Sequence, residues 1–438
     1  MWPQSQVKLG EALLVVASLL IGGSLLQAQE QTPPVERPAS QSTCLVCHSN
    51  LGGSLAAPTK PFPEDVHAGK GLTCASCHGG DPTSMEEKVA MSAAKGFRGK
   101  PSRQQVPEFC GRCHSNVSFM HQFNPSVKTD QVSQYYTSLH GQQLRSGDQR
   151  VATCINCHSV HDIKLVSDPS APVYPLNIPD TCGRCHSDEQ YMAGYDLPGL
   201  TQVTEYKTSV HYNALTVKGD LSAPTCVSCH GSHGATPPGV RSVADVCGTC
   251  HAHNLEYFEK SPHQAAFAAL GVPGCVQCHS NHAIQPTGEK MLVGNESVCM
   301  TCHLEGDNGA NRAQEMAASL GQLDSRIQLA RDVLAEADRA GMDVSSATAT
   351  LTAAHSHLIM ARTAVHSLDL AQVEEEINQG LPTANQAVEE GHQKLAEVQS
   401  RRRGFGLFAL LVVAIVVCLY LYIRQEKESP SSASSSLT

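Results

Sequence analysis

The chain has 438 residues, with 31 Lys and Arg against 41 Asp and Glu, and its formal net charge at pH 7 is −10. Because no basic stripe interrupts the cysteine-rich region from Cys44 to His303, nucleic acid is excluded as a partner. Aromatic residues make up only 5% of the chain and a single Trp is present. A chain of this length would suggest two or three domains with conventional apolar cores. The aromatic content is low for such cores.

The N-terminal residues 1–28 resemble a secretory signal peptide. Ala12 to Leu26 form a continuous apolar run behind Lys8, as in such signals. Glu11 in the charged part and Leu26 near the cleavage position are unusual, so an uncleaved membrane anchor is the alternative. Residues 29–41 are rich in Pro and are predicted to form a linker.

Residues 42–303 contain one motif nine times, Cys-x-x-Cys-His, and the copies use 18 of the 19 cysteines. The cysteine pairs and the histidine that follows each are Cys44, Cys47 and His48; Cys74, Cys77 and His78; Cys110, Cys113 and His114; Cys154, Cys157 and His158; Cys182, Cys185 and His186; Cys226, Cys229 and His230; Cys247, Cys250 and His251; Cys275, Cys278 and His279; Cys299, Cys302 and His303.

This spacing is the attachment signature of c-type haem. Thiols at i and i+3 can add to the two vinyl groups of one porphyrin, and the adjacent His binds the iron from the proximal side. Zinc ribbons also use Cys-x-x-Cys pairs, but tetrahedral closure requires no His after each pair. Disulfide frameworks occur mainly in short secreted chains and show no such unit. We therefore expect nine covalent haems, which supply much of the core among short helices and loops.

The motif region is also a repeat. Three copies, beginning at Ser138, Ser209 and Ser261, share the order Ser-x-His, then Cys-x-x-Cys-His-x-x-His, then a second Cys-x-x-Cys-His. A degenerate copy runs from His67 through the motifs at Cys74 and Cys110, and the motif at Cys44 stands alone in front. Each full copy is predicted to bind two haems.

Nine further histidines lie in the motif region, as many as nine six-coordinate irons need. They are His67, His121, His140, His161, His211, His233, His253, His263 and His282. A His three residues after a proximal His stays on the proximal side of its own porphyrin, so His161, His233 and His282 should bind a neighbouring iron. Two axial imidazoles leave no position for a substrate and favour electron transfer.

Because of these Cys-x-x-Cys-His-x-x-His strings, the region from Cys44 to His303 resembles the low-potential multihaem cytochromes c. It is similar to the class III type and to the pentahaem and octahaem nitrite and hydroxylamine enzymes. The resemblance implies a periplasmic electron carrier with packed haem pairs. Nitrite reductases of that group usually have one Cys-x-x-Cys-Lys site, and no motif here ends in Lys, which argues against reductase activity.

Residues 304–403 change to a heptad-like apolar pattern, which predicts an antiparallel bundle of three or four helices. The first helix carries Met316, Leu320, Leu323, Ile327, Ala330, Leu334 and Ala337; a second begins near Val344; a third begins after Asp369, with a break or kink at Gly380 and Pro382. His355 and His366 lie on nearly one stripe of the bundle. They are alternatives as ligands of an outlying haem, such as the one at Cys44 or Cys299.

Residues 404–423 carry no charge and are long enough to cross a bilayer as a helix. Haem attachment occurs on the outer face of the membrane, so we expect a cytoplasmic (inner) membrane protein with its haem region in the periplasm. Residues 424–438 are then a Ser-rich cytoplasmic tail. Cys418 within the span is predicted to be an apolar filler. The bundle is a stalk or docking element, and a homo-oligomer formed through it is an alternative.

The fold class expected is mainly α with much irregular structure: multihaem cytochrome c repeats, then the bundle, then one C-terminal transmembrane helix. The function expected is electron relay through bis-His haems between a membrane redox complex and a periplasmic acceptor or donor. One alternative is an oxidoreductase acting on nitrite, hydroxylamine or a sulfur oxyanion at one open haem. Another is a signalling protein, which the short tail makes less favoured.

Overall fold

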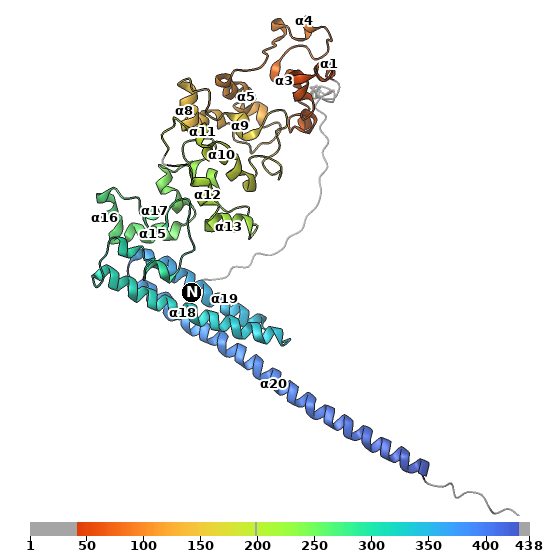
Figure 1. Ribbon diagram of the computed structural model, residues 1–438, viewed down its shortest axis with the longest axis vertical. Helices are drawn as coiled ribbons and strands as arrows, with labels where there is room; N and C mark the ends of the chain where they lie inside the picture. Colours follow the sequence, from red (N-terminus) through yellow and green to blue (C-terminus); the bar gives the residue numbers. More distant parts are fainter. Residues whose placement is uncertain (1–41, 198, 429–438) are drawn as a thin grey trace, which may run out of the picture.

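The computed structural model describes residues 42–197 and 199–428 (Figure 1). The predicted signal segment and linker, residues 1–41, lie outside the described residues, as do the last ten residues of the predicted tail. No strand occurs in the described ranges. The expected mainly helical fold with one long apolar C-terminal helix is confirmed.

The motif region consists of short helices joined by irregular segments. Its α-helices are α1 (Thr43–Leu51), α2 (Gly53–Ala56), α3 (Cys74–His78), α4 (Glu87–Ala90), α5 (Val106–His114), α6 (Val117–Met120), α7 (Gln131–Tyr135), α8 (Leu139–Arg145), α9 (Cys154–His158), α10 (Ile178–His186), α11 (Glu189–Met192), α12 (Gln202–Tyr206), α13 (Val210–Thr216), α14 (Cys226–His230), α15 (Ala252–Lys260), α16 (Pro262–Leu270) and α17 (Gly274–His279).

Short 3₁₀ segments link many of these helices, and two of the nine motifs begin in such a segment, at Cys247 and Cys299. They are η2 (Ala57–Thr59), η3 (Phe62–Glu64), η4 (Ala68–Lys70), η5 (Ala93–Lys95), η6 (Arg103–Gln105), η7 (Pro175–Asn177), η8 (Val243–Thr249), η9 (Glu289–Met291) and η10 (Cys299–Thr301). In Figure 1 the motif region extends from α1, at the end far from the bundle, to α15–α17 beside it.

Capping residues explain why such short helices form. Thr73, Thr153 and Thr225 each precede a motif helix and cap its N-terminus in a capping box with the residue three positions later. Ser138 and Ser209 cap α8 and α13, and the side chain of each accepts a hydrogen bond from the backbone N–H three positions later, in Gly141 and Tyr212. Each cap satisfies backbone N–H groups that a one-turn helix otherwise leaves unpaired.

The C-terminal part is a bundle of α18 (Asn308–Arg339), α19 (Ser345–Ala364) and the long helix α20 (Leu370–Glu428), with the 3₁₀ turn η11 (Val365–Ser367) before α20. Every apolar residue predicted for the seam of the first helix is buried, from Met316 to Ala337. These side chains pack against buried residues of the other two helices, among them Leu358, Val373 and Ile377. The predicted helical bundle is therefore confirmed.

The predicted break at Gly380 and Pro382 is wrong, because α20 continues through both residues. Pro382 cannot donate a backbone hydrogen bond, so tertiary packing must hold the helix there. A Cβ atom at Gly380 would lie 2.7 Å from Leu323 Cδ2 and 2.9 Å from His357 Cβ. The missing side chain thus permits close helix packing on both sides of this point.

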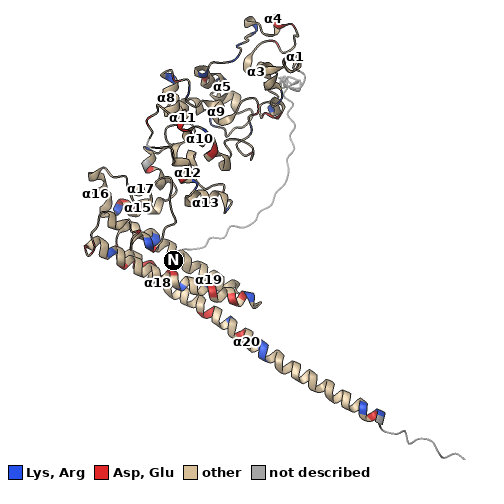
Figure 2. Cartoon of the chain, viewed as in Figure 1, with Lys and Arg blue, Asp and Glu red and all other residues tan. Residues whose placement is uncertain are grey.

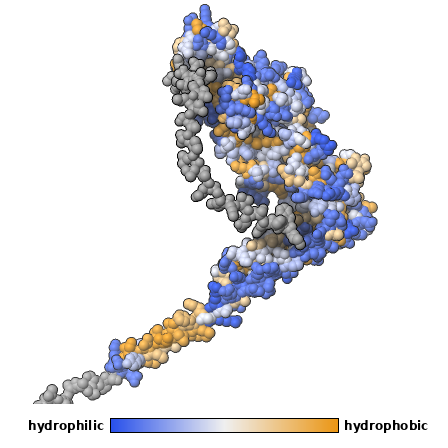
Figure 3. Space-filling view, turned by 180° about the vertical axis from the view of Figure 1, so that it is seen from behind, coloured by the Kyte–Doolittle hydropathy of each residue, from blue (hydrophilic) through white to orange (hydrophobic). Residues whose placement is uncertain are grey.

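The far half of α20 leaves the bundle and is exposed over its whole length (Figure 3). It is the one helix among the described residues that is long and apolar enough to cross a membrane, with a mean hydropathy of 2.8 in its most apolar window. Figure 2 shows charged residues at both ends of this apolar stretch, which include Arg401, Arg402 and Arg403 before it and Arg424 and Lys427 after it.

Replacing Leu358 with alanine tests how far the bundle depends on its seam. Leu358 is fully buried between the three helices. The truncation leaves a cavity, and we expect it to lower the free energy of unfolding of the bundle by about 2–5 kcal/mol. Leu329→Ala on the exposed side of α18 is the matched control and should change it by less than about 0.5 kcal/mol. Equal losses in thermal or urea unfolding would contradict this packing.

Candidate functional site

One continuous cavity of about 3350 Å³ runs through the motif region and ends against the bundle. This exceeds several-fold the roughly 300–1,000 Å³ of a single small-molecule site. All nine proximal histidines and 17 of the 18 motif cysteines line it. The large buried apolar side chains of an ordinary core are scarce here, since the core cluster outside the bundle consists of Tyr135, Leu144 and Val151. The cavity occupies the place of a core.

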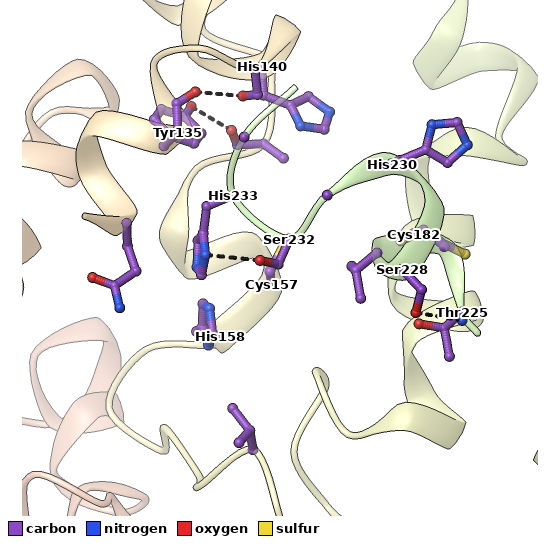
Figure 4. A pocket seen from close by; sticks show the side chains of 18 of the residues that line it. Tyr135, His140, Cys157, His158, Cys182, Thr225, Ser228, His230, Ser232 and His233 are labelled. Atoms are coloured by element: carbon purple, nitrogen blue, oxygen red, sulfur yellow. Dashed lines mark hydrogen bonds between the residues drawn. The ribbon is translucent and has the colours of Figure 1, made fainter. Parts of the chain in front are cut away.

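Three of the predicted distal histidines face a proximal His of the preceding repeat. The ring centroids of His161 and His78 are 6.2 Å apart, those of His233 and His158 are 6.0 Å apart, and those of His282 and His230 are 6.1 Å apart. The rings are nearly parallel in each pair. We call His161, His233 and His282 the return histidines. Figure 4 shows one such pair, His158 and His233.

Four other predicted distal histidines face the second motif of their own repeat. The ring-centroid distances are 6.0 Å for His67 and His114, 6.0 Å for His140 and His186, 6.3 Å for His211 and His251, and 6.0 Å for His263 and His303. We call His67, His140, His211 and His263 the cap histidines, because three of them follow a helix-capping Ser. Buried Asp65 takes the place of that Ser before His67.

The spacing of about 6 Å fits one metal ion between two imidazoles. Metal–imidazole bonds are about 2.0–2.1 Å long, which puts the two ring centres about 6 Å apart. The Nδ1 atoms of several of these rings lie near backbone or carboxylate oxygens: His78 Nδ1 is 2.8 Å from Gly99 O and His67 Nδ1 is 2.9 Å from Asp65 Oδ1. An imidazole that donates from Nδ1 keeps Nε2 for a metal. The donor set therefore fits a haem iron with two axial histidines.

Desolvation shifts several of the facing imidazoles toward the neutral form that metal binding requires. Desolvation, and next the neighbouring His186, lower the pKa of His140. Desolvation likewise lowers the pKa of His158, with smaller contributions from His233 and His114.

The backbone turns sharply after the proximal His in the first motif of each repeat. The next residue has positive φ at all four places: Gly79, Ser159, Gly231 and Ser280, with φ between 63° and 79°. For the two serines this conformation is strained, since it is occupied almost only by Gly. The turn ends the motif helix and changes the direction of the backbone. The return histidine therefore lies away from its own motif and near the preceding repeat.

Consecutive motifs pack against one another. The helix α1 contacts α3, α5 contacts α9, α10 contacts α14, and η8 contacts both α14 and α17. Within the first two repeats, Arg112 of the second motif donates to Cys77 O of the first, and Arg184 likewise donates to Asn156 O. The motifs from Cys44 to Cys275 are therefore arranged in space in the order in which they occur along the chain.

Three histidines depart from the predicted pairing. His121 is exposed, and the side chain of His253 is 86% exposed beside Glu256. Neither lines the cavity or faces a proximal ring among the described residues. His48 also has no imidazole opposite it in the described ranges; its Nδ1 lies 3.3 Å from Leu55 O. Of the nine histidines expected as distal ligands, seven thus face a proximal ring, and an eighth facing imidazole comes from outside the motif region.

That eighth histidine is His366, in η11 of the bundle. Its ring centroid lies 5.9 Å from that of His279, and the rings are nearly parallel, as for the return histidines. Its Nδ1 is 2.9 Å from Thr363 O, and burial lowers its pKa. The sequence marked it only as an alternative, and for other haems than this one. The repeat pattern could have indicated it. No repeat follows the last one to supply a return histidine, so the first motif of the last repeat needs a partner from outside the repeats.

The zinc and disulfide alternatives find no support in the described residues, which include all 19 cysteines. Every cysteine is free, and no group of three or more His, Cys, Asp or Glu side chains in these ranges is placed to hold a bare metal ion.

Replacing Asp65 with alanine tests how one cap histidine is held. Asp65 Oδ1 accepts from the His67 backbone and contacts its ring, and Oδ2 accepts from Ile163 N at 2.8 Å. The variant leaves these groups unpaired, and we expect a loss of about 1–3 kcal/mol of stability and a changed spectrum for one low-spin iron. Asp81→Ala, which removes a partly exposed carboxylate that accepts from Thr83 in its own loop, is the control. Identical spectra for both variants would contradict this role.

Two comparisons bear on the cofactor. Residues 66–187 match the family model described as cytochrome c3, and residues 246–322 match the model described as cytochrome c554 and c-prime. No curated protein and no solved structure matches the chain. The first match spans the first two repeats, and the second spans the last three motifs and the start of α18. The matches, together with the facing histidines and the cysteine pairs beside them, support a multihaem c-type cytochrome with covalently bound haem.

Proposed function

We propose that this chain is a membrane-anchored periplasmic nonahaem c-type cytochrome that relays electrons between a membrane redox complex and a periplasmic acceptor or donor. The observation that supports it best is the set of eight facing histidine pairs, all with ring centroids 5.9–6.3 Å apart. A haem iron, when bound, takes up and releases one electron. Two imidazoles on one iron leave no axial position for a substrate.

The residues around the pairs favour electron transfer over proton chemistry. Most of the proximal and distal histidines are half-buried, and desolvation lowers the pKa of most of the rings. The cavity wall between the motifs is rich in apolar side chains such as Phe109, Leu255 and Phe258. Such a wall keeps water from the irons and fixes the two ligands in one geometry. Little has to rearrange when the charge of the iron changes.

The sequential order of the motifs supports a relay along the long axis of the molecule. Packing contacts connect consecutive motifs, including the first step, where α1 contacts α3. In Figure 1 the first motif, in α1, lies at the end far from the membrane helix, and the last motifs lie beside the bundle. Electrons would thus pass between the membrane side and an outer end.

The membrane assignment depends on α20. The same helix packs its first half into the bundle, through Val373, Ile377 and Val388, and exposes an apolar second half. A continuous helix of 59 residues would hold the motif region at a fixed distance from the bilayer. Because c-type haem is attached on the outer face, the tail after 423 would be cytoplasmic.

The experiment is a reductive titration of the purified full-length protein, together with protease accessibility of a C-terminal tag in spheroplasts. We expect about nine electrons per polypeptide, one for each motif, no turnover with nitrite or hydroxylamine, and a tag that is protected until the cells are lysed. Fewer electrons with steady turnover of either substrate would contradict the relay, and a tag cleaved in intact spheroplasts would contradict the orientation.

One observation keeps the oxidoreductase alternative open. The motif at His48 has no facing imidazole among the described residues, unlike the other eight. An iron with one free axial position can bind a substrate.

A further inference from the structure

The pairing follows a rule that separates the motifs into two kinds. The first motif of each repeat (proximal His78, His158, His230 and His279) receives a histidine from beyond its own repeat. The second motif of each repeat (His114, His186, His251 and His303) receives the cap histidine that precedes its own repeat's first motif. The histidine that faces a second motif therefore always precedes that motif in the sequence.

The place of the motif at Cys44 in the chain shows which kind it is. Each first motif at Cys154, Cys226 and Cys275 follows a second motif in the sequence. The helical segments that hold the two motifs of each such step pack together, α5 with α9, α10 with α14 and η8 with α17. The motif at Cys44 likewise precedes the first motif at Cys74, and α1 packs against α3. The motif at Cys44 thus occupies the place of a second motif, whose partner would be a cap histidine before Cys44.

The sequence before Cys44 contains no histidine. The return position of the first repeat is also not a histidine: it is Asp81, whose carboxylate accepts from Thr83 N and Oγ1. We propose that the haem iron held by His48 has no second imidazole and binds small exogenous lone-pair donors, such as cyanide on the ferric iron and carbon monoxide on the ferrous iron. The inference rests on the proposed haem attachment and places an open iron at one end of the relay.

Exposed side chains surround His48 and allow such ligands to reach it. Leu51 and Leu55, which line the cavity beside it, are 56% and 53% exposed. Met85 and Met91 line the cavity too, on the segment that Thr43 holds through Pro82 O and Ser84 O. Both methionines are exposed, at 60% and 37%.

At the opposite end of the repeats, a histidine from the bundle takes the place of the missing return histidine. The first motif of the last repeat has no following repeat, and the bundle supplies His366 in the same nearly parallel geometry as a return histidine. The two ends therefore differ: an imidazole from the bundle completes the membrane end, and none completes the outer end. An external ligand or electron acceptor would therefore reach the relay at the solvent-accessible iron of the outer end.

The experiment is electron paramagnetic resonance of the oxidised full-length protein, with a cyanide titration. We expect one high-spin ferric iron per polypeptide, converted to low spin by one equivalent of cyanide. Cys44→Ala with Cys47→Ala, which removes that attachment site, should abolish both signals. Met85→Leu and Met91→Leu should leave them unchanged.

The outcomes distinguish a failure of this inference from a failure of the proposed relay function. A protein with uniformly low-spin irons and no cyanide binding overturns the inference and leaves the relay intact. A high-spin signal that survives in the Cys44→Ala, Cys47→Ala protein also overturns it, as does a far-red methionine–iron band lost on either Met→Leu change. Several high-spin irons, or far fewer than nine haems, would instead overturn the proposed function itself.

Discussion

Replacing His366 with alanine is expected to open the iron held by His279, although the two residues are 87 positions apart in the sequence. The rings face each other with centroids 5.9 Å apart, and no other imidazole faces His279 among the described residues. One iron should change from low to high spin and bind one additional equivalent of cyanide. His366→Met should restore a low-spin iron with a higher reduction potential, because a thioether ligand favours the ferrous state.

The bundle should also loosen from the motif region in the alanine variant. The contact between them depends on few polar links, among them the ion pair of Arg362 with Glu289 at 3.0 Å and the contact of Asn254 Nδ2 with His366 Nδ1 at 3.4 Å. We expect faster proteolysis between 303 and 308. The matched control is His355→Ala, on the same side of the bundle but outside the cavity; a spectrum changed equally by both variants would rule out axial ligation by His366.

Removing the middle attachment site, by Cys182→Ala together with Cys185→Ala, is expected to interrupt the relay. Two contacts place this motif between its neighbours, since Arg184 donates to Asn156 O in the preceding motif and α10 packs against α14, which holds the following motif. If the order in space is the order along the chain, no other motif bridges the two halves. Electron transfer from the membrane end to a soluble acceptor at the outer end should fall by more than tenfold in stopped-flow measurements.

The control for this variant is the removal of a terminal site. Cys44→Ala with Cys47→Ala also deletes one attachment site but leaves the other eight contiguous, so reduction of the last motifs should proceed at the original rate. His140, which faces His186 of the middle motif, should lose its partner in the middle variant only. Equal rates in the middle variant and the unchanged protein would show that electrons bypass the middle motif.

The sequence predicted the architecture well where the signal was local and periodic. The heptad-like spacing from Met316 to Ala337 gave the buried seam of α18, and the start of α20 after Asp369 followed from its capping side chain, which accepts from Ala371 N. The prediction of a break at Pro382 was wrong because it used only the helix propensity of the residues around it. In this structure the packing of the bundle around Gly380 and Leu323 outweighs that local propensity.

The histidine partners were less predictable because they join distant parts of the chain. Seven of the nine proposed distal histidines face a proximal ring, and these are the ones that recur at fixed positions in the repeats, plus His67. His121 and His253 had no recurrence and stand apart. His366 lay outside the repeats, so neither spacing nor composition could assign it to His279; only the folded arrangement brings the two together.

The central claim is that paired histidines hold the irons in the order of the motifs. Near-infrared magnetic circular dichroism of the oxidised full-length protein, combined with a haem count by mass, tests it most directly. The account predicts nine haems per polypeptide, one for each motif, and eight low-spin irons with two histidine ligands, one for each facing pair. Fewer haems, or histidine–methionine signals at several of the irons, would contradict it.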